Sequence, residues 1–186
     1  MTQQAFAAPV PQPWRGMTRE QYDALVATGL MTEHVELIEG DIVEMAPQGD
    51  DHAGAITRIT RKLGREAPDP WYLRVQLPLA TSLTSEPEPD LALTDLPASG
   101  HPTTAALVIE VAVTSQAMDL QVKPAVYAAA DVTEYWVLDV PAREVVVHTD
   151  PGPTGYRLVR RQPWSEPLTA PVGDGITVDL ASLLGG

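Results

Sequence analysis

The sequence predicts an α/β fold with a central mixed β-sheet flanked by helices. Residues 51–66 repeat apolar side chains at helical spacing, whereas residues 106–113 form an apolar run typical of a strand covered on both faces. Helical and strand patterns alternate along the chain, which is typical of an α/β protein. A length of 186 residues fits one domain, which we place at residues 17–186 after a flexible N-terminal arm at residues 1–16.

The first part of this domain is expected to contain a helix and a hairpin. Thr18 followed by Gln21 is a capping-box pattern, which predicts the start of a short amphipathic helix. Residues 35–39 and 42–45 flank Gly40-Asp41, a two-residue sequence of hairpin type. These two segments are therefore expected to pair as antiparallel strands.

The rest of the chain alternates helix and strand patterns. In the helix at residues 51–66, the side opposite the apolar stripe carries Arg58, Arg61 and Arg65. Residues 71–77 alternate apolar and polar side chains, with the period of a half-buried strand. The remaining predicted elements are strands at residues 91–93, 106–113 and 135–138, a helix ending near residue 130, and a closing antiparallel pair at residues 145–148 and 156–159.

Composition excludes several classes of protein. The chain has no cysteine, so it has no disulfide framework, thiolate nucleophile or cysteine zinc site. No run approaches the roughly 20 apolar residues of a membrane span, and residues 1–16 lack the features of a secretory signal, so we expect a cytoplasmic protein without membrane contact. Twelve Lys and Arg against 25 Asp and Glu give a net charge of −13, which opposes nucleic-acid binding unless divalent cations reverse the local field.

Two carboxylates occupy positions where the sequence predicts burial. Glu110 lies inside the apolar run at residues 106–113, where a carboxylate needs a cation or another strong partner. Asp90 precedes the strand at residues 91–93, and the two carboxylates would come together if the two strands are neighbours. Mg²⁺ needs only one or two carboxylates besides water and a substrate phosphate. Lys123 is a candidate to polarise the attacking water or to stabilise charge in the transition state.

Short segments over residues 17–139 carry a family resemblance. They are Met17–Tyr22, Glu36–Gly40, His52, Pro89-Asp90, Glu110-Val111, Asp119 with Lys123 and Tyr127, and Glu134–Asp139. In this order they resemble the Uma2-type endonucleases (DUF820), a branch of the PD-(D/E)XK nuclease superfamily.

The resemblance implies a restriction-endonuclease-like core and a Mg²⁺- or Mn²⁺-dependent endonuclease that hydrolyses phosphodiester bonds of DNA. It implies that Asp90 and Glu110 are catalytic metal ligands, that Lys123 is the catalytic lysine displaced onto a helix, and that Glu36 is an additional catalytic acid. Because nucleases of this superfamily often pair to cut both strands, a homodimer is expected, with the strands after residue 145 as its surface.

Accessory residues are also expected. His52 is a candidate for closing the site, although a histidine in the first turn of a helix is also compatible with a structural role. Asp119 is a second candidate accessory residue. Arg58, Arg61 and Arg65 form a surface suited to DNA phosphates. Cations near the C-terminus of a helix are equally favoured by the helix dipole.

The chain departs from the family pattern at three points. Ala112 occupies the superfamily's usual lysine position, two residues beyond the acidic ligand. Val113-Thr114-Ser115-Gln116 replaces the family's Ser-x-Ser-Thr, and Pro124 directly follows Lys123. Because proline is tolerated in the first turn of a helix, Pro124 predicts a helix start near Lys123.

Each principal site residue has a structural alternative. Asp90 after proline is compatible with a turn, and Glu110 with an ion pair to Arg74. Lys123 is compatible with a solvated helix position, and Glu36 with an exposed hairpin charge. The corresponding functional alternatives to a DNA endonuclease are a catalytically decayed protein that acts as a binding or assembly domain, and a hydrolase of another phosphate ester.

Overall fold

A six-stranded mixed sheet forms the centre of the protein in the computed structural model, which describes residues 16–29, 34–45, 47–95 and 101–185. The predicted arm at residues 1–16 lies, except for Gly16, outside the described residues. The sheet has the strand order β3-β4-β5-β6-β7-β8; only β5 and β6 pair in parallel. Its strands are β3 (Tyr72–Val75), β4 (Leu91–Thr94), β5 (Leu107–Ala112), β6 (Glu134–Asp139), β7 (Glu144–Gly152) and β8 (Gly155–Pro163).

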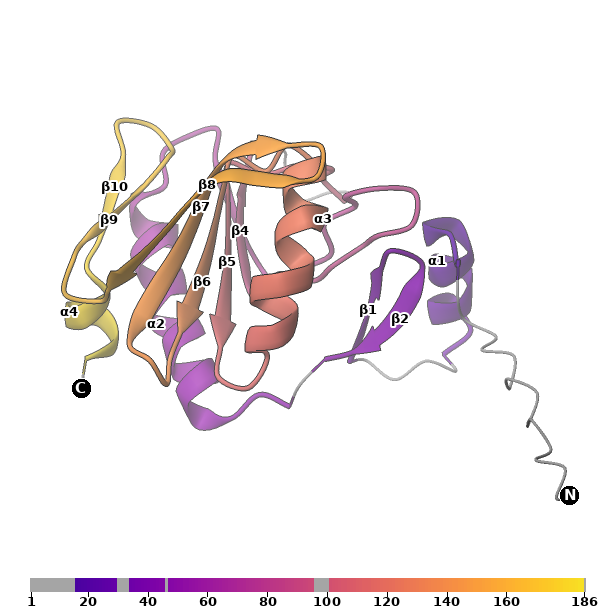
Figure 1. Cartoon of the computed structure of the whole chain (residues 1–186), viewed down its shortest axis with the longest axis horizontal. Helices are drawn as coiled ribbons and strands as arrows, with labels where there is room; N and C mark the ends of the chain where they lie inside the picture. The colour runs from indigo at the N-terminus through magenta and orange to yellow at the C-terminus, as the bar shows by residue number, and fades with distance from the viewer. Residues whose placement is uncertain (1–15, 30–33, 46, 96–100, 186) are drawn as a thin grey trace, which may run out of the picture.

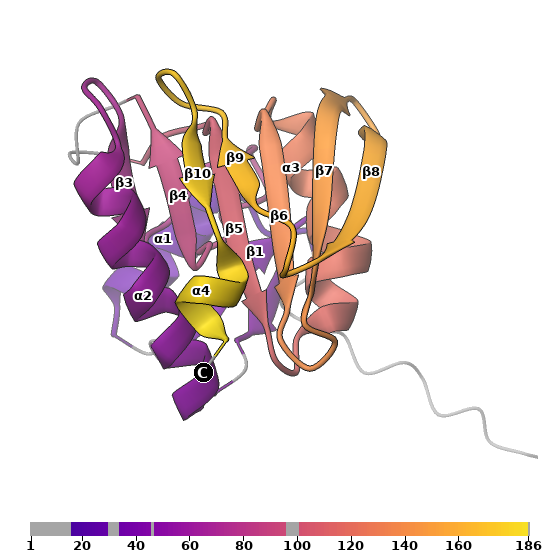
Figure 2. The ribbon, with the colours of Figure 1, turned by 90° about the vertical axis from the view of Figure 1, so that its left-hand side faces the viewer.

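Helices cover both faces of this sheet, as predicted. Helix α2 (Asp50–Glu66) lies on one face with the short strands β9 (Leu168–Ala170) and β10 (Ile176–Val178) and helix α4 (Leu180–Leu184), whereas α3 (Lys123–Ala129) lies on the other (Figures 1 and 2). The small C-terminal elements carry no clear periodic pattern, and the sequence did not predict them. No helix in the described part of the chain is long and apolar enough to cross a membrane.

Strand β5 is the centre of the core, because every one of its residues is buried. Towards α2 it packs through Leu107, Ile109 and Val111 in a cluster that includes Ile59 and Leu63 of α2. Towards α3, a second cluster contains residues such as Val108 and Tyr127. The apolar run at residues 106–113 therefore forms the predicted central strand covered on both faces.

Helix α1 (Arg19–Ala27) and the β1–β2 hairpin lie beyond α3, on the same side of the sheet (Figures 1 and 2). The predicted capping box is present, with Thr18 as N-cap of α1. The hairpin pairs β1 (Val35–Ile38) with β2 (Asp41–Glu44), so its two-residue turn is Glu39-Gly40, one residue earlier than predicted. Both turn residues have positive φ, 49° and 84°, which suits a primed hairpin turn.

A backbone bridge attaches the hairpin to the loop that leads into β4. Leu37 and Glu86 exchange hydrogen bonds in both directions, at 2.7 Å and 3.4 Å. The Ser85 hydroxyl accepts a further hydrogen bond from the backbone N–H of Glu39 at 2.8 Å. This bridge brings strand β1, and with it Glu36, against residues that are about 50 positions later in the sequence.

The segment after β5 forms one π-helical turn, η1 (Met118–Val122), that continues into α3. The α-helical part begins at Lys123, as predicted, with Pro124 in its first turn, although the turns of η1 precede it without a break. Such π turns occur frequently at functional sites.

Strand β3 differs from its predicted pattern. The alternation over residues 71–77 placed Arg74 on the exposed side, yet Arg74 is buried and Leu77 is exposed. The Arg74 guanidinium donates to the carbonyl of Pro78 at 3.2 Å, and burial lowers its pKa. The loop after β3 therefore covers Arg74, whereas Tyr72, at the other end of the same face of the strand, stays exposed.

Candidate active site

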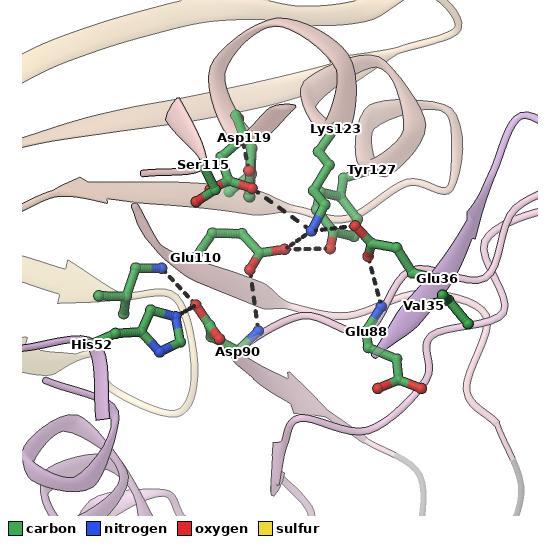
Figure 3. A network of polar contacts seen from close by, with 12 residues as sticks. Val35, Glu36, His52, Glu88, Asp90, Glu110, Ser115, Asp119, Lys123 and Tyr127 are labelled. Carbon is green, nitrogen blue, oxygen red and sulfur yellow. Dashed lines mark hydrogen bonds and ion pairs between the residues drawn. The ribbon is translucent and has the colours of Figure 1, made fainter. Parts of the chain in front are cut away.

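A cleft of about 520 Å³ opens between the hairpin, the first turn of α2 and the segment that follows β5. Its lining contains one lysine, Lys123, and two histidines, His34 and His52. The acidic residues that line it are Glu36, Glu44, Glu88, Asp90, Glu110 and Asp119. The cleft therefore concentrates negative charge, and Figure 3 shows how its inner side chains approach one another.

Sheet register brings Asp90 and Glu110 together. Strands β4 and β5 are antiparallel, with Leu91 opposite Ile109, so one further residue places Asp90 opposite Glu110. The backbone N–H of Asp90 donates to Glu110 Oε2 at 3.2 Å, and the backbone N–H of Val111 donates to Asp90 Oδ2 at 2.8 Å (Figure 3). Both carboxylates are buried, and burial raises the pKa of Glu110 well above its ordinary value.

Lys123 enters the same cluster from the start of α3. Its ammonium lies 3.0 Å from Glu110 Oε1, 3.1 Å from Glu36 Oε1 and 3.7 Å from Asp119 Oδ1. The side chain is only 7% exposed, which contradicts a solvated helix position. Although burial opposes the charged form, the carboxylates of Glu110, Glu36 and Asp119 raise the pKa of Lys123. The three carboxylates therefore favour the charged ammonium form of Lys123.

Glu36 and Asp119 complete the carboxylate shell around this ammonium. Glu36 is 2% exposed and accepts a hydrogen bond from the backbone N–H of Glu88 at 3.2 Å, so the interpretation as an exposed hairpin charge is wrong. Asp119 lies on the π turn and accepts a short hydrogen bond from the Ser115 hydroxyl. Burial raises the pKa of Asp119.

His52, in the first turn of α2, contacts the opposite side of the cluster. Its Nε2 lies 3.0 Å from Asp90 Oδ2, and this hydrogen bond raises the pKa of His52. The Nδ1 atom of the ring is buried without a hydrogen-bond partner among the described residues. His52 therefore makes its side-chain hydrogen bond to Asp90 alone.

Tyr127 is a member of this cluster to which the sequence reasoning gave no role. Its hydroxyl donates to Glu110 Oε1 at 2.8 Å, and the side chain is fully buried. Tyr127 lies four residues after Lys123, and this spacing places both side chains on one face of α3. That spacing was the available signal, once Lys123 was assigned to the site.

The four arginines considered in the sequence analysis lie outside the cleft lining. Arg58, Arg61 and Arg65 are exposed on α2 and do not line the cleft. Among the described ion pairs, Lys123 and not Arg74 is the partner of Glu110, so the predicted alternative of an Arg74–Glu110 pair is wrong.

The cluster suits a hard cation. Three buried carboxylates, from Glu36, Glu110 and Asp119, surround Lys123, and a fourth, Asp90, lies beside Glu110. Burying this many carboxylates beside one lysine is costly unless some are neutralised, by protonation or by a further cation. In the described part of the chain, no group of three or more His, Asp or Glu side chains is arranged to hold a metal ion. Asp90 and Glu110 are the residues that would hold Mg²⁺, which needs only one or two carboxylates plus water and substrate phosphate.

The fold and the cleft define an α/β protein with a carboxylate and lysine cluster between two central strands and a helix. The chain belongs to the Uma2 family, described as "Putative restriction endonuclease", which matches residues 19–181. It is also similar to the crystal structure of "a putative nuclease belonging to DUF820 from Anabaena variabilis ATCC 29413", with a TM-score of 0.66 and 17% sequence identity over 91% of this chain and 98% of that one. None of the curated proteins matches the chain. The predicted family and the restriction-endonuclease-like fold are thus confirmed.

Proposed function

We propose that the protein is a Mg²⁺- or Mn²⁺-dependent endonuclease that hydrolyses phosphodiester bonds of DNA in this cleft. The observation that carries the proposal is the contact between Asp90 and Glu110 across β4 and β5, with Lys123 on the second oxygen of Glu110. Membership of the Uma2 family supports nuclease chemistry. We also propose a homodimer, because a single cleft cleaves one DNA strand at a time and two clefts are needed to cut both strands.

The chain's own residues have distinct tasks in this reaction. Asp90 and Glu110 would hold the cation, which lowers the pKa of a bound water and stabilises negative charge on the phosphate when it is present. Lys123 supplies a permanent positive charge for the phosphate oxygens, on which charge increases in the transition state. Glu36 and Asp119 hold the Lys123 ammonium towards Glu110.

Plasmid nicking tests the proposal. Purified wild-type protein with Mg²⁺ or Mn²⁺ is expected to convert supercoiled DNA to the open-circular form, and EDTA is expected to stop the reaction. Asp90→Ala and Glu110→Ala are expected to lower the rate by more than about 100-fold, since each removes a cation ligand. Equal nicking by the wild type and both variants would attribute the activity to a contaminant and contradict the proposal.

A second function is favoured by one observation. The three carboxylates around Lys123 neutralise it, as in a buried ion-pair cluster that serves the fold alone. A catalytically decayed protein acting as a binding or assembly domain would have this arrangement, and Ala112 and Val113 agree with it. This alternative predicts no carboxylate-dependent cation binding, so calorimetric Mn²⁺ binding that disappears in Glu110→Ala would exclude it. If cations bind but DNA is not cleaved, a panel of other phosphate esters tests a different hydrolase activity.

A further inference from the structure

The two oxygens of the Asp90 carboxylate have different environments. Oδ2 accepts the backbone N–H of Val111 at 2.8 Å and faces His52 Nε2 at 3.0 Å. A carboxylate oxygen has about two lone-pair sites, so these contacts occupy Oδ2. No hydrogen bond of the described residues ends on Oδ1, which leaves this atom with its full capacity for a ligand.

The two oxygens of the Glu110 carboxylate also have different environments. Its Oε1 receives the Lys123 ammonium at 3.0 Å and the Tyr127 hydroxyl at 2.8 Å, and is thereby occupied. Its Oε2 accepts one hydrogen bond, from the backbone N–H of Asp90 at 3.2 Å, and keeps one lone-pair site. Each carboxylate therefore has one oxygen held by the protein and one with free capacity.

We infer that His52 and Tyr127 are positioning residues, which hold Asp90 Oδ2 and Glu110 Oε1 so that Asp90 Oδ1 and Glu110 Oε2 receive the cation. This inference rests on the proposed function, since it names the residues that orient the ligands of that site. His52 and Tyr127 act through Asp90 and Glu110 and touch neither the cation nor the substrate themselves.

The surroundings of both residues support an orienting role. The His52 ring has no hydrogen bond among the described residues other than the one to Asp90, because its Nδ1 is buried without a partner. Tyr127 is fully buried and packs against Tyr135 at a ring-centroid distance of 4.8 Å, which fixes the direction of its hydroxyl. Partners of metal-binding side chains commonly fix the ligand geometry in this way.

Calorimetric titration with Mn²⁺ alone, on the full chain, tests the inference without relying on cleavage. Tyr127→Phe removes only the hydroxyl, and His52→Leu removes the Nε2 donor; each is expected to weaken Mn²⁺ binding by about 10- to 100-fold. His52→Gln restores an N–H donor at the same number of bonds from the backbone, so it is expected to recover most of the affinity.

Tyr156→Phe is the matched control. The Tyr156 hydroxyl also donates to a protein oxygen, but this is the Val132 carbonyl at 2.8 Å and not a carboxylate of the proposed cation site. This variant is expected to bind Mn²⁺ with wild-type affinity while its melting temperature changes about as much as that of Tyr127→Phe. A purely structural role for Tyr127 predicts equal affinities in the two variants.

The outcomes separate this inference from the proposed function. If the wild type binds Mn²⁺, Glu110→Ala does not, and the His52→Leu and Tyr127→Phe variants bind as the wild type does, the positioning roles are wrong and the cation site stands. If His52→Gln binds as weakly as His52→Leu, the donor role of His52 is wrong. If the wild type binds no Mn²⁺, the inference and the proposed cation site are both overturned.

Discussion

Lys123 reaches the cleft from a helix, whereas Ala112 occupies the position, two residues beyond Glu110, at which the resemblance to the PD-(D/E)XK superfamily led us to expect a lysine. Ala112 is fully buried between the sheet and α3, where a lysine stem would meet the packed core. The π turn and Pro124 set the start of α3 so that Lys123 points to Glu110 Oε1. A lysine therefore contacts Glu110 even though Ala112 stands at the expected lysine position.

Substitution of Lys123 tests whether this charge acts in catalysis. Lys123→Met keeps the aliphatic stem but leaves three carboxylates without their partner. We expect nicking to fall by more than about 100-fold. We also expect the metal-free protein to lose about 3–5 kcal/mol of unfolding free energy, the usual cost of breaking a buried pair. Nicking assays and urea denaturation in EDTA measure the two effects.

Lys62→Met provides the matched control, because Lys62 forms an exposed ion pair with Glu66 at 2.7 Å. An exposed pair of this kind contributes little, so stability is expected to change by less than about 1 kcal/mol and nicking to stay unchanged. Full nicking by Lys123→Met would exclude a catalytic role for the lysine and leave only a structural one.

At this scale, the sequence predicts that Asp90 and Glu110 come together, because Glu110 interrupts an apolar run and Asp90 stands at the entrance of a strand. The structure places the two residues side by side, and their role as cation ligands stays a prediction. Glu36 gave no comparable signal, because its position on the cleft depends on the bridge between Leu37 and Glu86. The Tyr127 hydrogen bond likewise depends on how α3 docks on the sheet.

At the scale of elements, the sequence predicts those that are long or strongly periodic. The amphipathic pattern of α2 and the apolar run of β5 led to the correct elements. Strands β9 and β10 have three residues each, too few for a period to be visible, and they exist because they cover the sheet beside α2. The burial of Arg74 could not be predicted either, because the alternation of side chains in a strand does not reveal that a following loop covers one of them.

Helix α2 links the cleft to an exposed basic stripe, defined by Arg58, Arg61 and Arg65. His52 in its first turn touches Asp90, and Arg65 lies roughly 20 Å further along the helix axis, at 1.5 Å per residue. Since the lining of the cleft is acidic, we predict that DNA phosphates dock on this stripe. Replacing all three arginines by glutamate is expected to weaken DNA binding by at least about 10-fold, as measured by fluorescence anisotropy.

The control for this prediction changes the same kind of charge on another element. Arg157→Glu with Arg161→Glu places two reversals on β8, at the edge of the sheet farthest from β3. A specific role for α2 requires a larger loss of affinity per charge in the α2 variant. Equal losses per charge would show that only net charge matters and would contradict a docking stripe.

For the whole molecule, the net charge of −13 is distributed unevenly. Six acidic side chains line one cleft, while exposed arginines lie on α2 and β8. Composition alone opposed DNA binding, but it did not reveal that part of the excess charge is gathered where a cation would neutralise it. The repulsion of DNA is therefore expected to be local to the cleft and to depend on divalent cations.

Because the cleft is acidic, removing its carboxylates is expected to strengthen DNA binding in the absence of metal and to abolish cleavage. Asp90→Asn with Glu110→Gln removes two negative charges from the cleft at nearly constant shape. In EDTA, the double variant is expected to bind a DNA duplex more tightly than the wild type, because two repulsive charges are absent. Cleavage is expected to be lost, since both cation ligands are gone. Anisotropy titrations in EDTA and in Mn²⁺ measure the effect; Mn²⁺ should strengthen binding by the wild type alone. Weaker binding by the double variant in EDTA would show that the carboxylates do not repel DNA at this cleft.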